Sequence, residues 1–216
     1  MIRAAIDHLV VTAPSLATGI EFVHDALGVT AQPGGRHPRM GTHNALVKFD
    51  DSTYLEVLAI DPATRPPGHP RWFGLDDLDA HSAPALAAWV ARVEDIHAAL
   101  AAMGVTGDVK AMSRGSLEWL IAIPADGQLS AAGVMPVLIQ WLHEGHPAPE
   151  LEGSGCSLDS LRGLHADGSQ IARPMGKVHF DARWSLAPAT VEDKPGLVAT
   201  IQTARGAQTL VTRGRA

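Results

Sequence analysis

The sequence predicts an α+β protein in which two βαβββ modules pair to form a curved mixed sheet around a central cleft, followed by a β-rich extension. Strand-like and helix-like patterns follow one another in the same order twice along the 216 residues. Residues 8–16 align with 88–96 at a constant offset, and 54–62 align with 138–147 with one extra residue near the end. The repetition is one of pattern more than of identity, and it predicts two copies of one module.

The first module is expected over residues 1–62. Its helix has Ser15 as a candidate N-cap and Gly28 as a candidate stop signal. A further short strand in or before the loop would complete the module. In chain order, the pattern predicts a strand at 6–12, a helix at 15–27, a loop rich in Gly and Pro at 32–42, and strands at 43–49 and 54–60.

A proline-rich connector, residues 63–85, separates this module from the second, which is expected over 86–150. The second module is expected to contain a strand at 86–93, a helix at 94–103, and strands at 116–123 and 136–142.

The extension, residues 151–216, looks like a shortened third module or a segment that covers a sheet edge. It contains possible strands at 158–164, 177–184, 197–203 and 207–212, and a stub of helix near 171–175.

Composition narrows the class of protein. The chain is 46% hydrophobic and 19% charged with a net charge of −6, so it lacks the basic excess of a generic nucleic-acid binder. A single cysteine, Cys156, allows no intramolecular disulfide and fits a reducing compartment. We find neither a signal-peptide pattern nor 18 consecutive apolar residues, so we expect a cytoplasmic protein with no membrane partner.

One carboxylate stands out within a strand that otherwise reads as buried. Residues 54–60 read YLEVLAI, so Glu56 shares a face with Tyr54 and Leu58. In paired modules the first and last strands of a module face the cleft, where His8 would meet Glu56. Burying an ionised carboxylate is costly unless it is paired, hydrogen-bonded or bound to a metal, and a divalent metal held by His8 and Glu56 would supply that partner.

Longer stretches resemble a known family. DHLVVTAPSLATGIEFV, GGRHPRMGTHNAL and YLEVLAIDP resemble the glyoxalase-like branch of the vicinal oxygen chelate superfamily, and WVARVEDIHAALAAMGV and MPVLIQWLHEGHP resemble its second half. The resemblance covers about residues 5 to 212. It implies paired modules around a metal, with ligands on the first and last strand of each. Members include lyases, isomerases, extradiol dioxygenases, resistance enzymes and metal-free binding proteins.

The resemblance implies ligand positions one by one. His8 and Glu56 match the first-strand histidine and last-strand glutamate, and Glu56 is also the candidate catalytic carboxylate. The equivalent positions in the second module are Ala88, which cannot ligate, and Gln140, whose amide oxygen is a candidate third ligand. The implied cofactor is a divalent ion (Mn, Fe, Ni, Zn or Mg), or none.

Three further residues are candidates for substrate binding: His37 and His43, which are also candidate extra ligands, and Asn44. The alternative for each is an ordinary hydrogen bond to a loop or to the backbone. Trp89 and Trp141 are expected on the face away from the site, packed against the helix layer.

Three functions remain open on the sequence. The first is a metal-dependent enzyme acting on a small molecule with vicinal oxygens, as a lyase, isomerase or dioxygenase. The second is a non-catalytic protein that sequesters a small molecule in the same cleft without metal. The third is a vestigial cleft whose sheets serve oligomerisation. Two modules in one chain can close a cleft alone, so a monomer or a homodimer is expected.

Overall fold

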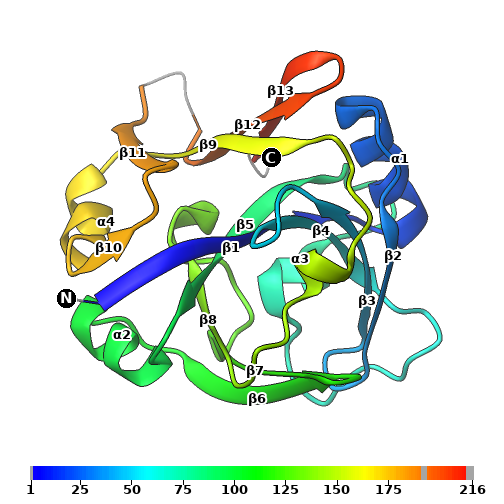
Figure 1. Ribbon diagram of the computed structural model, residues 1–216. Helices are drawn as coiled ribbons and strands as arrows, with labels where there is room; N and C mark the ends of the chain where they lie inside the picture. The colour runs from blue at the N-terminus through cyan, green and yellow to red at the C-terminus, as the bar shows by residue number, and fades with distance from the viewer. Residues whose placement is uncertain (1, 191–193, 213–216) are drawn as a thin grey trace.

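The computed structural model describes residues 2–190 and 194–212, and it confirms the α+β class. One strongly curved mixed sheet wraps around a cleft, and a second sheet formed by the C-terminal segment lies across its outer side (Figure 1). The remaining residues of the predicted extension, 191–193 and 213–216, lie outside the described part of the chain. No helix within the described residues is long and apolar enough to cross a membrane.

The first module has the predicted helix, and its caps are those expected. The Ser15 side chain accepts a hydrogen bond from the Thr18 N–H, and Gly28 ends the helix with φ at 75°. Part of the predicted loop at 32–42 is a strand, β2, whose irregular pairing with its neighbour hides the usual alternation. The elements are β1 (Ile2–Thr12), α1 (Leu16–Leu27), β2 (Gln32–His37), β3 (Thr42–Lys48) and β4 (Tyr54–Ile60).

The second module repeats this order and contains one strand that the sequence did not reveal. That strand is β6, in which Met112 is the one fully buried side chain, so it carries no apolar alternation. The elements are β5 (Ala85–Val93), α2 (Ile96–Met103), β6 (Asp108–Arg114), β7 (Leu117–Ile123) and β8 (Val137–Trp141), with 3₁₀ turns η1 (Trp72–Asp77) and η2 (Ser130–Gly133) and the short helix α3 (Pro147–Glu150).

The extension forms the second sheet and adds one strand to the first. The single strand expected at 177–184 is two strands, because the chain turns at residues 181–183. The elements are β9 (Ser157–His165), α4 (Gly168–Met175), β10 (Val178–Phe180), β11 (Trp184–Pro188), β12 (Gly196–Thr203) and β13 (Gly206–Val211).

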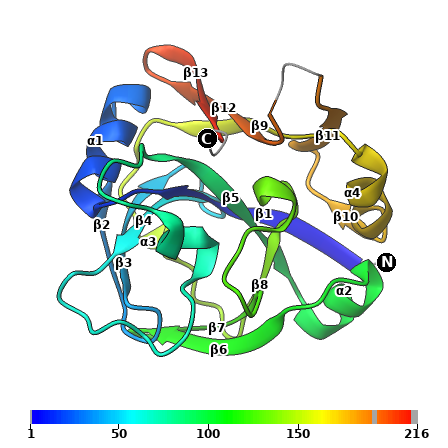
Figure 2. The same ribbon diagram turned by 180° about the vertical axis from the view of Figure 1, so that it is seen from behind.

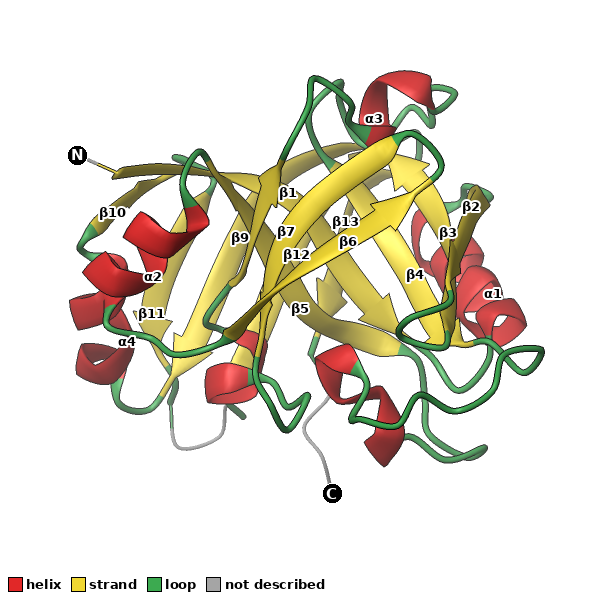
Figure 3. Cartoon of the chain, turned by 90° about the horizontal axis from the view of Figure 1, so that it is seen from below, coloured by secondary structure: helices red, strands yellow, loops and turns green. Residues whose placement is uncertain are grey.

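The two modules join through their first strands. β1 pairs antiparallel with β5, and the large sheet runs in the order β2-β3-β4-β1-β5-β8-β7-β6. β10 pairs with residues 2–4 of β1, beyond the end of β4. Figure 3, seen from below, shows β6 and β7 crossing in front of β1 and β5, so the sheet curls back towards its own other edge. The Arg39 side chain donates across this gap to the Ala111 carbonyl at 3.0 Å.

Each face of the large sheet has its own core. The outer face packs against α1 and α2 and against the second sheet, which Figure 2 shows from behind. The inner face carries Val10, Ala88 and Val90 together with the aromatic residues of η1. Ile6 belongs to the outer core, although regular alternation would place it on the same face as His8. The strand changes phase between these two residues.

Candidate functional site

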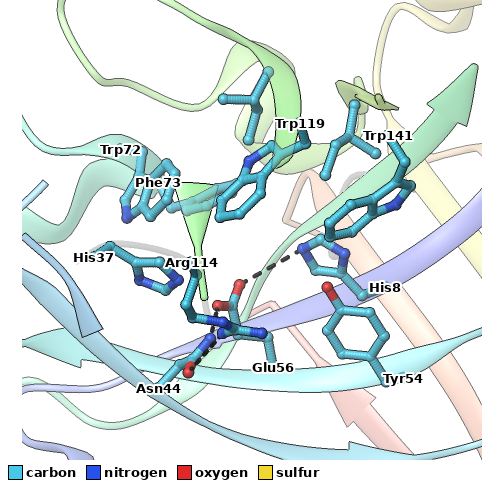
Figure 4. Close-up of a pocket in the computed structure, with 12 residues that line it drawn as sticks. His8, His37, Asn44, Tyr54, Glu56, Trp72, Phe73, Arg114, Trp119 and Trp141 are labelled. Atoms are coloured by element: carbon cyan, nitrogen blue, oxygen red, sulfur yellow. Dashed lines mark hydrogen bonds and ion pairs between the residues drawn. The ribbon is translucent and has the colours of Figure 1, made fainter. Parts of the chain in front are cut away.

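A small pocket lies on the inner face and draws on both modules and the connector. Its walls come from β1, β2, β3 and β4 of the first module, from β6, β7 and β8 of the second, and from η1 (Figure 4). Its cavity of about 30 Å³ has room for roughly two water molecules. A larger ligand therefore requires side chains at the pocket mouth to move.

His8 and Glu56 meet in this pocket. On the parallel strands β1 and β4, His8 lies opposite Tyr54, so Glu56 is two residues further along on the same face. The His8 Nε2 and Glu56 Oε2 atoms are 3.6 Å apart, and the side chains are 6% and 8% exposed. The ring of Tyr54 stacks on the imidazole of His8, with centroids 4.6 Å apart. Burial raises the pKa of the Tyr54 hydroxyl well above its usual 10, so the hydroxyl stays neutral.

Asp7 holds the other nitrogen of His8. The Asp7 Oδ1 and His8 Nδ1 atoms are 2.7 Å apart. Neighbours on a regular strand point to opposite faces, but β1 has a bulge between Ile6 and His8 in its pairing with β5, which turns both side chains inward. An ionised carboxylate only accepts hydrogen bonds, so when the imidazole is neutral its proton lies on Nδ1 and the Nε2 lone pair faces the cleft.

The second oxygen of Asp7 faces three further hydrogen-bond donors. Trp141 Nε1, His146 Nε2 and Arg92 Nη1 lie 2.9, 3.2 and 3.3 Å from Asp7 Oδ2. Burial alone would raise the pKa of this carboxyl, but the hydrogen bonds from His146 and His8 hold it far below its usual value. Asp7 is therefore a buried, permanently ionised carboxylate behind His8. Sequence reasoning missed it, because regular alternation places it on the outer face.

Asn44 holds the second oxygen of Glu56, and Arg114 in turn holds Asn44. The Asn44 Nδ2 donates to Glu56 Oε1 at 2.5 Å, and Arg114 Nη1 donates to Asn44 Oδ1 at 3.3 Å. The Gly35 N–H also donates to Asn44 Oδ1, at 2.7 Å, and a Cβ at Gly35 would lie 2.5 Å from Arg114 Cδ. Arg114 thus reaches from the second module to the polar wall of the first. It was missed because its strand, β6, shows no pattern in the sequence.

His37 also lines the pocket, from the end of β2. Its Nδ1 is 3.1 Å from Thr42 Oγ1, and its ring meets the indoles of Trp72 and Trp119 edge to face. Burial lowers the pKa of His37 to about 4, against the pull of Glu56, so the ring is neutral near pH 7.

The structure does not bring Gln140 or His43 into the pocket. The Gln140 Oε1 accepts the Ile96 N–H at 2.9 Å on the outer face, where it caps α2. Ile139 and Trp141 line the pocket instead, so the expectation that Trp141 faces away is wrong, while Trp89 does lie in the outer core. The alignment of the two modules was displaced by one residue, which reverses the faces of a strand. His43 precedes Asn44 on β3 and points to the opposite face.

Apart from Arg114, the half of the pocket from the second module is apolar. Trp119, Ile121, Ile139 and Trp141 form this half, and Trp72 and Phe73 of the connector close one side (Figure 4). Phe73 has φ at 56°, a left-handed conformation that costs a non-glycine residue about 1–2 kcal/mol. Strain of this kind is retained where the surrounding structure fixes a side chain, here against the pocket.

The donor set does not fit a resident divalent metal. His8 and Glu56 are the two donors that converge, and the positions that face them from the second module are Ala88, Ile139 and Trp141. Within residues 2–190 and 194–212, no group of three or more His, Cys, Asp or Glu side chains is placed to hold a metal ion. A protein site for Zn or Mn normally offers three or more such ligands.

Paired βαβββ modules around a cleft are the architecture that the resemblance in the sequence implies. The sequence model of the glyoxalase-like domain matches residues 6–178. The chain therefore belongs to the glyoxalase-like domain family, of the vicinal oxygen chelate superfamily, as the resemblance in its sequence predicted. A search of curated proteins finds no match.

Solved structures share the fold at low sequence identity. A hypothetical protein from Staphylococcus aureus superposes with a TM-score of 0.55 at 14% identity, over 96% of this chain and 84% of that one. A methylmalonyl-CoA epimerase from Mycobacterium tuberculosis gives a TM-score of 0.42 at 19% identity, over 63% of this chain and 85% of that one. The first supports the fold alone, and the second is too distant to bear on activity.

Proposed function

We propose that this protein is an acid–base enzyme that moves a proton on a small molecule with vicinal oxygens, and that it does so without a resident metal. The observation that carries the proposal is the line from Asp7 through His8 to Glu56, with contacts of 2.7 and 3.6 Å. A carboxylate behind an imidazole, facing a second carboxylate in an apolar pocket, is an arrangement suited to general acid–base catalysis.

The proposed role of each side chain follows from which of its polar atoms has no hydrogen bond to Asn44 or Asp7. Glu56 Oε1 is held by Asn44, so Oε2 is the atom that takes a proton from a carbon beside a carbonyl. The electron pair moves onto the carbonyl oxygen, and the guanidinium of Arg114 supplies positive charge for that oxygen. The proton then returns to the same or the neighbouring carbon, so the reaction is an isomerisation and requires no oxidant.

His8 has the second role in this proposal. With Asp7 on Nδ1, its Nε2 takes and returns the proton of a substrate hydroxyl while the ring stays in one orientation. The stacked ring of Tyr54 restricts rotation of the imidazole. A molecule with adjacent carbonyl and hydroxyl oxygens offers one group to each of His8 and Glu56.

A second candidate is a non-catalytic protein that sequesters a small molecule without metal. The apolar half of the pocket favours it, since Trp119 and Trp141 offer flat surfaces to a ring. Under this alternative Glu56 only binds a ligand hydroxyl, and its replacement by glutamine weakens binding without removing any turnover.

The experiment is proton–deuterium exchange followed by NMR. Acetoin and mandelate, which carry vicinal oxygens and an exchangeable C–H, are incubated in D₂O with metal-free protein and EDTA. Wild type is expected to accelerate exchange over buffer, and Glu56→Gln to reduce that exchange by about 100-fold or more. Glu21→Gln, on the exposed face of α1, is the matched control and is expected to behave as wild type.

Two results count against the enzyme. Exchange equal in wild type and Glu56→Gln removes the proposed role of that carboxylate. Exchange no faster than in buffer, combined with a rise in melting temperature on adding either compound, supports the sequestering protein instead.

A further inference from the structure

A second and larger cavity lies on the same inner face, outside the pocket of His8 and Glu56. It has a volume of about 490 Å³ and lies where β1, β5 and β10 meet. Arg3, Arg92 and His179 provide its basic groups, and Trp141 and Phe180 provide aromatic walls.

Strand register connects the two cavities. Ala5 pairs with Arg92 and Arg3 pairs with His179, while His8 pairs with Val90. Because side chains two apart on a strand share a face, Arg92 points to the same side as Val90. At about 3.3 Å per residue along β5, Arg92 lies roughly 7 Å beyond Val90, the partner of His8. Arg3, one residue beyond the Ala4–Val93 pair, lies roughly 13 Å beyond Val90.

Trp141 separates the two cavities and lines both. Its indole Nε1 donates to Asp7 Oδ2 at 2.9 Å, so the ring stands beside the carboxylate that supports His8. A flat, apolar partition between two polar ends accommodates a ligand whose middle is a ring or an alkyl chain.

The charge in the larger cavity favours an anion. Two carboxylates, Glu94 and Asp181, also line it. Both oxygens of Asp181 are bonded to Arg183, at 2.7 to 3.2 Å, so its charge is already paired. Arg92 Nη1 donates one hydrogen bond to Asp7 Oδ2 at 3.3 Å, and the other N–H groups of its guanidinium can donate to a ligand. Arg3 and Arg92 together outweigh Glu94.

We propose that this second cavity binds the anionic end of the substrate, a carboxylate or a phosphate, through Arg3 and Arg92. The inference rests on the proposed function for its other end, where vicinal oxygens lie between His8 and Glu56. The substrate class is thus an elongated molecule, roughly 7–13 Å between its oxygen-bearing end and its anion, with an apolar middle against Trp141.

The test uses simple probes in calorimetric titrations at one fixed ionic strength. The probes are 4-phenylbutyrate, phenyl phosphate and the neutral 4-phenylbutyramide. Wild type is expected to bind at least one anion about tenfold or more tightly than the amide, because a charge-assisted pair is lost with the amide. The tighter of the two anions identifies the head group as carboxylate or phosphate.

Variants locate the binding. Arg3→Gln, which has no tie to Asp7, and Arg92→Gln are each expected to weaken anion binding about tenfold. Arg162→Gln, on the exposed face of β9, is the matched control and is expected to bind as wild type. Arg3→Gln keeps the test valid even when Arg92→Gln fails to fold.

Glu56→Gln separates this inference from the proposed function. It is expected to bind the anionic probe as wild type does while losing proton exchange. Equal affinity for the anions and the amide, or wild-type affinity in Arg3→Gln, overturns the anionic subsite whatever the exchange experiment shows.

Discussion

Asp7 and His8 are consecutive residues on one strand, yet the Asp7 Oδ1 and His8 Nδ1 atoms lie only 2.7 Å apart, and both side chains are buried. The bulge in β1 makes this possible by turning both side chains to the inner face. It also brings Asp7 within reach of Arg92, Trp141 and His146, from three other parts of the chain. One carboxylate thereby links the proposed catalytic histidine to the wall between the two cavities.

Replacing Asp7 by asparagine is expected to lower the free energy of unfolding by about 3 kcal/mol or more, because removing one partner of a buried charged network leaves the others unpaired. The amide nitrogen of the asparagine would also face donors that need an acceptor. Urea unfolding at pH 7 measures this loss. Asp25→Asn, on the exposed side of α1, is the control and is expected to change the value by less than about 0.5 kcal/mol. A loss in Asp7→Asn no larger than in this control contradicts the role given to Asp7.

The same carboxylate predicts how stability falls in acid. The pKa of Asp7 in the folded protein lies far below the 3.8 of an ordinary aspartate, so below about pH 4 the unfolded chain binds a proton that the folded chain does not. The stabilisation from Asp7 is therefore complete above that pH and is lost progressively as the pH falls further. Between about pH 4 and 2.5, the free energy of unfolding of Asp7→Asn, measured by urea titrations, is expected to fall less steeply than that of wild type. Equal slopes in the two proteins contradict this prediction.

His37 predicts a separate dependence at milder pH. Burial lowers its pKa from 6.5 to about 4, so between these values the unfolded state takes up a proton that the folded state refuses, and stability rises with pH. At about pH 4, protonation of His37 in the unfolded chain lowers the free energy of unfolding by on the order of 3 kcal/mol relative to pH 7. His37→Gln is expected to lose less stability than wild type between pH 7 and pH 4.5, and His24→Gln, exposed on α1, the same as wild type. The histidine signals in NMR spectra give the pKa of His37 directly, and a value near 6.5 contradicts the prediction.

Gln140 was expected from the sequence to be a metal ligand, but in the structure it has a structural role outside the pocket. Its side chain caps the Ile96 N–H at the start of α2, so Gln140→Leu is expected to cost about 1 kcal/mol of stability. Proton exchange and anion binding are expected to stay at the wild-type level, because the side chain lies on the outer face. Gln202→Leu, on the exposed side of β12, is the control for urea unfolding. A loss of exchange in Gln140→Leu without a loss of stability contradicts this placement.

Much of the fold was predictable because helix caps and the alternation of apolar residues are local features of the sequence. The helix at α1 has its cap at Ser15 and its stop at Gly28, and the alternation of β4 put Glu56 on the inner face. His8 and Glu56 were expected to converge because paired modules bring the first and last strands together. The strands and helices that could be recognised in the sequence were those with one buried and one exposed face, because these produce a periodic pattern of apolar residues.

The features that were missed depend on single-residue shifts. A bulge at Asp7 and a one-residue error at Gln140 each reverse the face of a strand, and neither leaves a trace in hydrophobicity. Arg114 was missed because β6 buries almost nothing, so the side chain that completes the polar wall lay in a segment without pattern. The wall of the pocket is therefore set by tertiary register more than by local sequence.

Two donors, His8 and Glu56, give a divalent ion too few protein ligands for tight binding. Wild type, His8→Ala and Glu56→Ala are expected to hold equal, substoichiometric metal after exposure to Mn, Fe, Ni, Zn or Mg and desalting, measured by elemental analysis. Their melting temperatures are expected to shift equally with each ion.

A tight site has a different signature. An ion present at 100 times its Kd stabilises the folded state by about 2.7 kcal/mol, which corresponds to roughly 5–10 °C in melting temperature for a chain of this size. His24→Ala, on the exposed face of α1, controls for surface histidine binding. A stoichiometric ion in wild type and in this control, absent from both His8→Ala and Glu56→Ala, would show that the two side chains hold a metal with help from water or substrate. The metal-free proton transfer would then have to be abandoned, while the anionic subsite, tested through Arg3, would be unaffected.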